Sequence, residues 1–305
     1  MILSVLGSGA GGGSPQWNCA CPTCQAVRRG EAPPRTQTSV AVSRDGRQWA
    51  LLNASPDLRS QIAATPALQP QRPGRHSPIA SVVLTGAEID QVVGLLHMRE
   101  GHPFSLYGSS TTLAALARSP IFDALPADRV PRRPLPPATP TALLDTRDEP
   151  LDLDIELFAV PGKVPLYEEN LDVEPDLLDE SGTTAALKIS DGSSTVFFIP
   201  GCAAITDDLK ARLHNADLLF FDGTLFRDDE LVTQGLSHKT GRRMGHLSID
   251  GPDGTMALLK DLPIPRKIFL HMNNSNPVLL PDSPERARVL DQGWEIAHDG
   301  MQIQI

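Results

Sequence analysis

Two groups of short apolar runs, each alternating with helical patterns, constrain the fold of this chain more than any other feature. Several runs, such as 82–84 and 218–221, are continuously apolar, which is typical of strands buried on both faces. A proline-rich segment at 119–141 separates the two groups. This arrangement fits two sheets packed face to face with helices outside better than one doubly wound sheet. We therefore predict an α/β (α+β) sandwich and a single domain, 1–305, built of two halves.

The expected elements follow from these runs and from the spacing of apolar residues between them. The predicted strands are 2–6, 38–43, 49–52, 81–84, 104–107, 155–160, 185–189, 195–199, 217–221, 267–270 and 302–305. The predicted helices are 57–64, 90–99, 112–118, 207–214, 254–262 and 284–292.

The charge of the chain excludes some classes of partner. Its 305 residues carry a formal net charge of −10, with an isoelectric point near 5.2. An acidic surface repels phosphate backbones and anionic lipids, so neither nucleic acid nor a membrane is an expected partner. No apolar run reaches the roughly 20 residues that span a bilayer. The N-terminal sequence MILSVLGSGAGGGS lacks the basic start of a signal peptide, so we expect a cytoplasmic protein.

Three of the four cysteines lie in the sequence CACPTC at 19–24. Without an export signal, this spacing favours a metal site over disulfides. Cys19, Cys21 and Cys24 can supply three corners of a tetrahedral zinc site, and the fourth ligand must come from elsewhere. Exposed thiols this dense would oxidise, which argues against three cysteines without a metal. Three sulfur ligands indicate a structural zinc, whereas Cys202 is expected to be a small buried side chain.

A second group of polar residues follows three predicted strands. Glu88 and Asp90 come after the first of these strands, Asp222 after the second and His271 after the third. Ligands and catalytic groups gather at strand ends in α/β architectures. Glu88 and Asp90 have a simpler interpretation as caps of the helix that begins there. Three carboxylates and a histidine at three strand ends nevertheless favour a shared site.

These residues resemble the pattern of the metallo-β-lactamase superfamily, in which a strand is followed by Thr-His-x-His-x-Asp-His. The segment TGAEIDQ at 85–91 keeps the aspartate as Asp90 but has glycine, Glu88 and Gln91 in place of the three histidines. The aspartate and the histidine at the two later strand ends match the rest of the pattern, but the histidine expected near 161–163 is absent. The resemblance implies a four-layer αββα fold whose two-zinc site is dismantled, which weakens a hydrolase interpretation.

Over nearly its full length the chain resembles the family of coenzyme PQQ synthesis B proteins within that superfamily. This resemblance implies a role in the biosynthesis of pyrroloquinoline quinone (PQQ), in which a glutamate and a tyrosine of a precursor peptide are cross-linked and oxidised. It further implies iron- and oxygen-dependent hydroxylation of the tyrosine ring in the cross-linked Glu–Tyr intermediate. The alternative is a non-catalytic carrier of PQQ or its precursor towards the periplasm. The matching stretches are 6–10 with the cysteine loop, 55–59, 200–203, 221–224, 244–246 and 271–277.

The resemblance also implies an active-site metal held by Glu88, Asp90, Asp222 and His271, with His246 as a further catalytic residue. Such an oxygen-rich set suits iron(II), as two-histidine, one-carboxylate oxygenase sites do. The expected partner is a small Glu–Tyr-derived PQQ precursor or PQQ itself. The oligomeric state, including a homodimer, is left open by the sequence.

Three basic residues are candidates for binding the carboxylates of the substrate. Arg59 and Arg99 offer planar guanidinium groups that can hold a carboxylate through two hydrogen bonds, and Lys239 offers a point charge. Each of the three is equally suited to a salt bridge that is unrelated to substrate.

The fourth zinc ligand is suggested by related phosphonate-pathway phosphodiesterases of the superfamily, which carry a histidine three residues after the final active-site histidine. The corresponding residue here is Asn274. An amide oxygen is a poor zinc ligand beside three thiolates, so the fourth corner is Asn274, water or another residue. The resemblance implies that this zinc ties the N-terminal loop to the strand end that carries His271.

Overall fold

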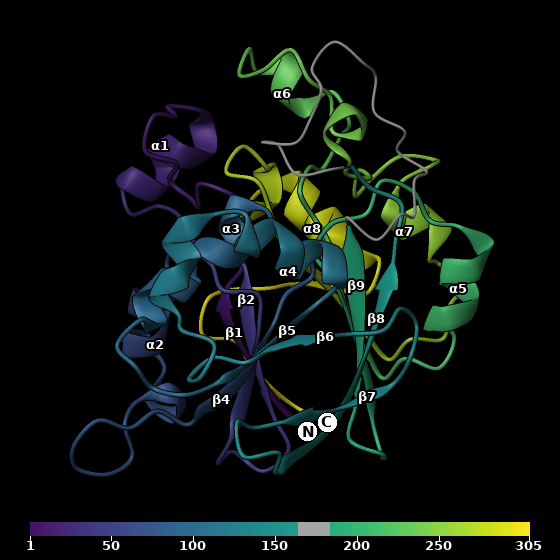
Figure 1. Ribbon diagram of the computed structural model, residues 1–305. Helices are drawn as coiled ribbons and strands as arrows, with labels where there is room; N and C mark the ends of the chain where they lie inside the picture. Colours follow the sequence, from purple (N-terminus) through teal and green to yellow (C-terminus); the bar gives the residue numbers. More distant parts are fainter. Residues whose placement is uncertain (164–183) are drawn as a thin grey trace.

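The computed structural model describes residues 1–163 and 184–305, and in this part of the chain the strands form two seven-stranded sheets (Figure 1). The strand order is β14-β1-β2-β3-β4-β5-β6 in the first sheet and β13-β12-β11-β10-β9-β8-β7 in the second. The first sheet contains β1 (Ile2–Gly7), β2 (Ser39–Ser43), β3 (Trp49–Leu52), β4 (Ile79–Val83), β5 (Ser105–Gly108), β6 (Arg132–Pro134) and β14 (Gln302–Gln304). The second contains β7 (Thr141–Leu144), β8 (Pro150–Ala159), β9 (Ala185–Ser190), β10 (Thr195–Ile199), β11 (Leu218–Asp222), β12 (Arg266–Leu270) and β13 (Trp294–Ile296).

Short helices connect these strands and cover the outer faces of the sheets (Figure 1). The helices are α1 (Pro22–Arg28), α2 (Leu58–Ala64), α3 (Ile89–Val92), α4 (Ser110–Ala117), α5 (Asp207–Leu213), α6 (Glu230–Thr233), α7 (Thr255–Leu258) and α8 (Pro284–Asp291). None of the helices in the described ranges combines the length and the apolar content that crossing a membrane requires.

The continuously apolar runs are explained by two separate cores. In β2, Val40 and Val42 pack in the core that both sheets share, whereas Ala41 between them packs in a second core under the helices that cover the first sheet. Neighbouring side chains of a strand point to opposite faces, so a strand that lies between two cores is apolar along most of its length. The predicted arrangement of two sheets face to face with helices outside is confirmed.

Several elements escape prediction because their sequences are too short or too polar to show a period. The edge strand β6 lies within the proline-rich segment at 119–141. Proline, which lacks an N–H group, is tolerated there because an edge strand pairs with a neighbouring strand on one side only. The sequence also misses β7, β13, α1 and α6. The helix predicted at 90–99 is instead the single turn α3 followed by a 3-10 helix, Val93–Met98.

The topology brings three chain segments together at one edge. Strands β11 and β12 are parallel neighbours, so Asp222 at the end of β11 and His271 after β12 reach the same edge of the second sheet. The loop after β1 joins them, because Met272 N–H donates to Ser8 O at 3.1 Å and Ala10 N–H donates to Met272 O at 2.8 Å. The site residues are therefore positioned by backbone pairing between the two ends of the chain.

Candidate metal centres

The sulfur atoms of Cys19, Cys21 and Cys24 lie within 4.8 Å of one another. Cys21 caps α1, and its Sγ accepts a hydrogen bond from Cys24 N–H at 3.4 Å. Cys19 Sγ accepts one from Cys21 N–H, also at 3.4 Å. Cys21 and Cys24 are buried and Cys19 is partly exposed. Three soft ligands thus converge in the closed surroundings that a structural zinc site requires.

The protonation of these thiols depends on their surroundings. Burial raises the pKa of Cys21 to about 12. Burial also acts to raise the pKa of Cys19, but hydrogen bonds from Cys21, Cys24 and Asn274 outweigh burial and lower that pKa. Zinc binds the thiolate form, so its binding must displace the proton that Cys21 holds in the metal-free chain.

Asn274, on the loop after β12, lies against the three cysteines. Its Nδ2 is 3.2 Å from Cys24 Sγ and 3.8 Å from Cys21 Sγ. Thr23 Oγ1 also donates to Ser275 O at 3.4 Å, so the cysteine loop is attached to the strand end that carries His271. An amide N–H that points at sulfur stabilises thiolate charge, whereas only the amide oxygen could bind zinc. The assignment of Asn274 as fourth ligand stays a prediction.

The second cluster consists of Asp222, His246 and His271, whose potential ligand atoms lie within 4.8 Å of one another. His271 directly follows β12 in a left-handed conformation with φ of 59°. His246 follows the 3-10 helix Arg242–Met244 through Gly245, whose φ of 85° favours glycine. The two imidazole rings are stacked, with centroids 5.4 Å apart. A left-handed non-glycine residue costs about 1–3 kcal/mol, and such residues cluster at functional sites.

The Asp222 carboxylate is fully buried and engaged through both oxygens. Its Oδ2 lies 2.7 Å from His246 Nδ1 and accepts a hydrogen bond from Cys202 N–H at 3.1 Å. Its Oδ1 accepts hydrogen bonds from Thr224 Oγ1 at 2.6 Å and Thr224 N–H at 3.0 Å. Burial acts to raise the pKa of Asp222, but the charge and hydrogen bond of His246, the charge of His271 and the Thr224 hydroxyl outweigh it and lower that pKa. Asp222 is therefore anionic, as a carboxylate ligand must be.

Asp90 reaches this cluster from the first sheet. Its Oδ2 lies 3.1 Å from His271 Nε2. Burial acts to lower the pKa of His271, but the hydrogen bond and charge of Asp90, with the charges of Asp222 and Glu88, raise it. Burial likewise acts to raise the pKa of Asp90, and the hydrogen bond and charge of His271 hold it below its ordinary value. The two groups form a half-buried ion pair in the absence of a metal.

Glu88 has a structural task beside the site. It is the N-cap of α3 and forms a capping box with Gln91, whose Oε1 accepts a hydrogen bond from Glu88 N–H at 3.1 Å. The alternative interpretation of Glu88 as a helix cap therefore agrees with the hydrogen bonds. Its predicted role as a metal ligand stays a prediction, as do the roles of the other candidate ligands.

Comparison with known proteins identifies the family. The family model described as "Beta-lactamase superfamily domain" matches residues 48–272. Coenzyme PQQ synthesis protein B of Xanthomonas campestris pv. campestris (strain B100) is 54% identical over 307 residues, covering 100% of each chain. The crystal structure of Zn²⁺-bound PqqB from Methylobacterium extorquens is 46% identical and superposes with a TM-score of 0.95, covering 100% of each chain. The chain belongs to the coenzyme PQQ synthesis protein B family.

More distant relatives of this PQQ synthesis B family member share its fold. A diphosphatase from the PhnP family is 21% identical and superposes with a TM-score of 0.69, covering 100% of this chain and 97% of the diphosphatase. Human tRNase Z, short form, is 16% identical and superposes with a TM-score of 0.57, covering 100% of this chain and 99% of the tRNase. At these identities the likeness concerns the fold alone. The predicted metallo-β-lactamase fold is confirmed by the family model and the close structure.

In this PQQ synthesis B protein a cavity of about 480 Å³ lies over the second cluster. Lys239 lines the cavity, as does Lys163, whose aliphatic stem packs against Gly245. Arg59 is an exposed residue of α2, and Arg99 is exposed and lies 3.5 Å from Glu100; neither lines the cavity. The predicted roles of Arg59 and Arg99 in substrate binding are therefore not supported by their position in the metal-free chain, and they stay predictions. The cavity is also lined by Ala10, Gly11, Gly12, Gln37, Glu88, Ile89, Asp90, Gln91, Thr184, Pro200, Gly201, Thr224, Met244, His246, His271 and Asn273.

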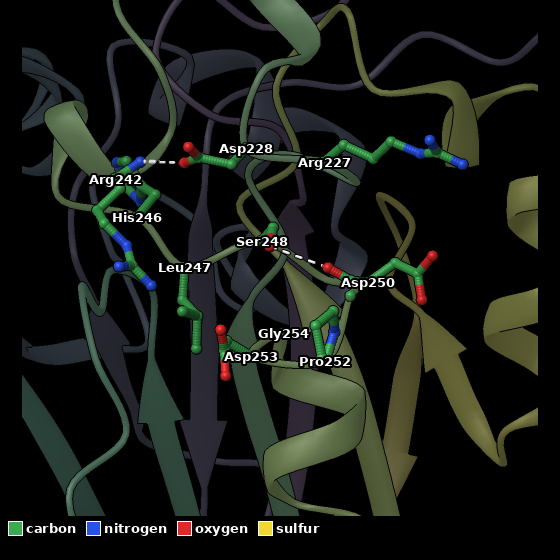
Figure 2. Close-up of a pocket in the computed structure, with 11 residues that line it drawn as sticks. Arg227, Asp228, Arg242, His246, Leu247, Ser248, Asp250, Pro252, Asp253 and Gly254 are labelled. Atoms are coloured by element: carbon green, nitrogen blue, oxygen red, sulfur yellow. Dashed lines mark hydrogen bonds between the residues drawn. The ribbon is translucent and has the colours of Figure 1, made fainter.

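A second cavity, of about 500 Å³, lies beside the first (Figure 2). His246 lines both cavities. Figure 2 shows the Arg227 and Arg242 side chains pointing in different directions, so the two guanidinium groups do not form a joint clamp. Asp228 lies between them and accepts a hydrogen bond from Arg242 N–H at 2.6 Å. With further carboxylates in its wall, this cavity has mixed charge and shows no preference for one class of ligand.

Two residues of the site are not predicted by the sequence. Thr224 contacts Asp222 and both histidines, yet the sequence marks it only as part of the matching stretch 221–224. Its place two residues after Asp222, at a strand end, is the signal that could have identified it. Lys163 follows a proline and a glycine after β8, and nothing in its local sequence singles it out.

Proposed function

We propose that this protein acts in PQQ biosynthesis as an iron- and oxygen-dependent hydroxylase of the tyrosine ring in the cross-linked Glu–Tyr precursor. The observation that carries the proposal is the cluster of two histidines and one carboxylate, His246, His271 and Asp222, within 4.8 Å. Two histidines and one carboxylate form the ligand set of many non-haem iron(II) oxygenases, which leave positions open for substrate and oxygen. The full-length identity to coenzyme PQQ synthesis protein B supports the pathway.

The donor set fits such a metal in chemical terms. Asp222 is held anionic by its neighbours, and each histidine presents a ring nitrogen to a neighbouring carboxylate. Asp90 stands beside His271 as a further oxygen ligand. Bound iron(II) would supply the activation of oxygen, and the protein's part is to bind and orient the substrate.

The cavity suits a small substrate rich in carboxylates. Its volume of about 480 Å³ falls in the range of small-molecule sites. Lys163 and Lys239 contribute two cationic side chains to its wall, on a chain whose net charge is −10. Ammonium groups attract the carboxylates of a glutamate-derived compound. We therefore assign the substrate's carboxylates to the lysine side of the cavity and its aromatic ring to the histidine side.

The reaction balances with an external reductant. One oxygen atom of O₂ replaces a ring hydrogen by a hydroxyl group, and the other leaves as water, with two electrons and two protons taken from a donor such as ascorbate. The test loads the protein with iron(II) under anaerobic conditions, then adds a synthetic cross-linked Glu–Tyr substrate, ascorbate and oxygen. Mass spectrometry is expected to find a product heavier by one oxygen atom, labelled when ¹⁸O₂ is used.

Matched variants make the test specific. His246→Ala and His271→Ala are expected to abolish the labelled product, whereas His214→Ala, at an exposed histidine after α5, is expected to leave it unchanged. Substrate or PQQ that binds stoichiometrically to the iron-loaded protein without oxygen transfer would overturn the hydroxylase and support a carrier.

A further inference from the structure

The hydroxyl group of Thr224 lies at the centre of the second cluster. Thr224 is 4% exposed, and its Oγ1 is 2.6 Å from Asp222 Oδ1, 3.1 Å from His246 Nδ1 and 3.0 Å from His271 Nδ1. One small side chain therefore touches all three members of the proposed metal centre.

The donors and acceptors at this hydroxyl determine its direction. A threonine hydroxyl has one hydrogen to donate and two lone pairs that accept. Two acceptors lie near the hydroxyl, Asp222 Oδ1 at 2.6 Å and the backbone oxygen of His271 at 3.1 Å; Oδ1 is nearer and charged, so it receives the hydroxyl hydrogen. The backbone N–H of Thr224 donates to the same oxygen at 3.0 Å. Oδ1 is thereby held by two donors from one residue, while Oδ2 accepts from Cys202 N–H at 3.1 Å and lies 2.7 Å from His246 Nδ1.

The lone pairs of the Thr224 hydroxyl can accept a hydrogen bond from His271. The ring of His271 has Nδ1 3.0 Å from Thr224 Oγ1 and Nε2 3.1 Å from Asp90 Oδ2. Because the hydroxyl donates its hydrogen to Asp222, it can only accept a hydrogen bond from Nδ1 of His271. It therefore favours the form of the imidazole ring in which Nδ1 carries the hydrogen. Nε2, which faces Asp90, is then the nitrogen left to a metal.

We propose that Thr224 is the positioning residue that selects Nε2 of His271 as the metal-binding atom and fixes the orientation of the Asp222 carboxylate. In metal sites a histidine ligand generally donates its other ring N–H to an oxygen atom, which fixes the ring and the position of its proton. Here one hydroxyl performs that task for His271 and orients the carboxylate of Asp222 as well. The inference rests on the proposed function only in taking these residues as the metal centre.

The structure offers matched variants for the test. Thr224→Val removes the hydroxyl and keeps the shape of the side chain, whereas Thr224→Ser keeps the hydroxyl. Thr255 is also fully buried, and its Oγ1 has no hydrogen-bond partner among the described residues, so Thr255→Val is the control for losing a buried threonine hydroxyl. The folding of each variant is checked by circular dichroism and by its urea unfolding curve before iron(II) is added.

The first measurement is the affinity for iron(II), by anaerobic competition with a chelator. Thr224→Val is expected to bind iron(II) about 10–100-fold more weakly than the parent, the usual effect of removing a hydrogen-bond partner of a metal ligand. Thr224→Ser and Thr255→Val are expected to match the parent. Equal affinity of Thr224→Val and the parent would overturn the inference and leave the proposed function standing. A parent chain that binds no iron(II) would overturn both.

The second measurement follows the proton on Nδ1 of His271. With cobalt(II) in the second site, this proton gives a paramagnetically shifted NMR signal that disappears in D₂O. The signal is expected to exchange slowly in the parent and in Thr224→Ser, and to broaden in Thr224→Val because its acceptor is gone. If Thr224→Val fails to fold, Thr224→Ala replaces it in both measurements. A sharp, slowly exchanging signal in the variant without the hydroxyl contradicts the proposal.

Discussion

His271 Nε2 lies 3.1 Å from Asp90 Oδ2, although 181 residues separate the two in the chain. Asp90 belongs to α3, which follows β4 of the first sheet, and His271 follows β12 of the second sheet. The pair therefore connects the two sheets at the edge where the cavity opens. In the absence of a second metal it is an ion pair, because the pKa of His271 is raised and that of Asp90 is lowered.

This pair predicts how stability depends on pH when only the cysteine site holds zinc. His271, with its raised folded pKa, contributes stability that is present below its ordinary pKa of 6.5 and is lost as pH rises through the folded value. Asp90, with its lowered folded pKa, contributes stability that is present above 3.8 and is lost as pH falls through its folded value. Asp90→Asn removes a hydrogen bond between charged groups and is expected to cost about 1.5–3 kcal/mol at pH 5.5 and less at pH 9.

The measurement is urea unfolding of parent and variant across that pH range. Asp253→Asn, at an exposed aspartate, is the control for the loss of one negative charge. A cost of Asp90→Asn that is the same at pH 5.5 and pH 9 would show that the ion pair does not form.

The fold could be predicted from the sequence because the strands of both sheets are buried on two faces. Val40, Ala41 and Val42 are apolar without interruption for this reason, and such runs mark strands clearly. The site could be predicted only in part. Asp222 and His271 stand at the ends of such strands, whereas His246 is held by a loop around Gly245, and no period in the sequence places that loop. Long-range contacts such as Thr224 with His271 depend on strand order, which a single sequence does not display.

Asp222→Asn tests the buried carboxylate at the centre of the second cluster. The carboxylate accepts from Cys202 N–H, Thr224 N–H and Thr224 Oγ1, and an amide has one acceptor oxygen instead of two. The variant leaves at least one buried donor without an acceptor, which costs about 1–3 kcal/mol. It also removes the charge of a proposed ligand, so we expect loss of iron(II) binding together with lower stability.

Isothermal titration with iron(II) and urea unfolding check the two effects separately. Asp228→Asn provides a comparison at a partly exposed aspartate outside the cluster. Undiminished iron(II) affinity in Asp222→Asn would remove this residue from the proposed ligands.

Cys21→Ser tests the cysteine site. Cys21 is buried, caps α1 and lies 3.6 Å from the backbone oxygen of Asn274, so it connects the cysteine loop to the β12 end. A serine hydroxyl is a much weaker zinc ligand than a thiolate. We expect the zinc content to fall and the melting temperature to drop, while iron(II) binding at the second site persists at temperatures where the variant stays folded.

Metal analysis by mass spectrometry, with zinc and iron quantified separately, measures the result. Cys202→Ser is the control, because Cys202 is buried but lies outside the thiol cluster. It is expected to keep a full equivalent of zinc. Equal zinc content in Cys21→Ser and the parent would mean that zinc is bound elsewhere.

Glu230→Gln tests a buried carboxyl group that supports the loop between the two metal centres. Glu230 is 7% exposed; its Oε2 accepts a hydrogen bond from Phe226 N–H at 2.9 Å and its Oε1 accepts one from Ser275 Oγ at 2.6 Å. Ser275 directly follows Asn274, which lies against the thiols. Burial raises the pKa of Glu230 from 4.5 to about 7. Compared with the unfolded chain, the folded protein therefore favours the protonated form of Glu230.

The raised pKa of Glu230 determines how the stability of the protein depends on pH. Below pH 4.5 the carboxyl group is protonated in both the folded and the unfolded chain, so Glu230 does not lower the free energy of unfolding. As pH rises from 4.5 through about 7, the free energy of unfolding falls by about 3 kcal/mol in total. Glutamine imitates the protonated form at every pH, so Glu230→Gln is expected to match the parent near pH 5 and to exceed it in stability at pH 8. Urea unfolding of the zinc-loaded protein at both values measures this difference, with Glu100→Gln as the control at an exposed glutamate. If parent and variant differ by the same free energy at pH 5 and pH 8, Glu230 is ionised in the folded protein throughout, and the loop that carries Asn274 tolerates a buried charge.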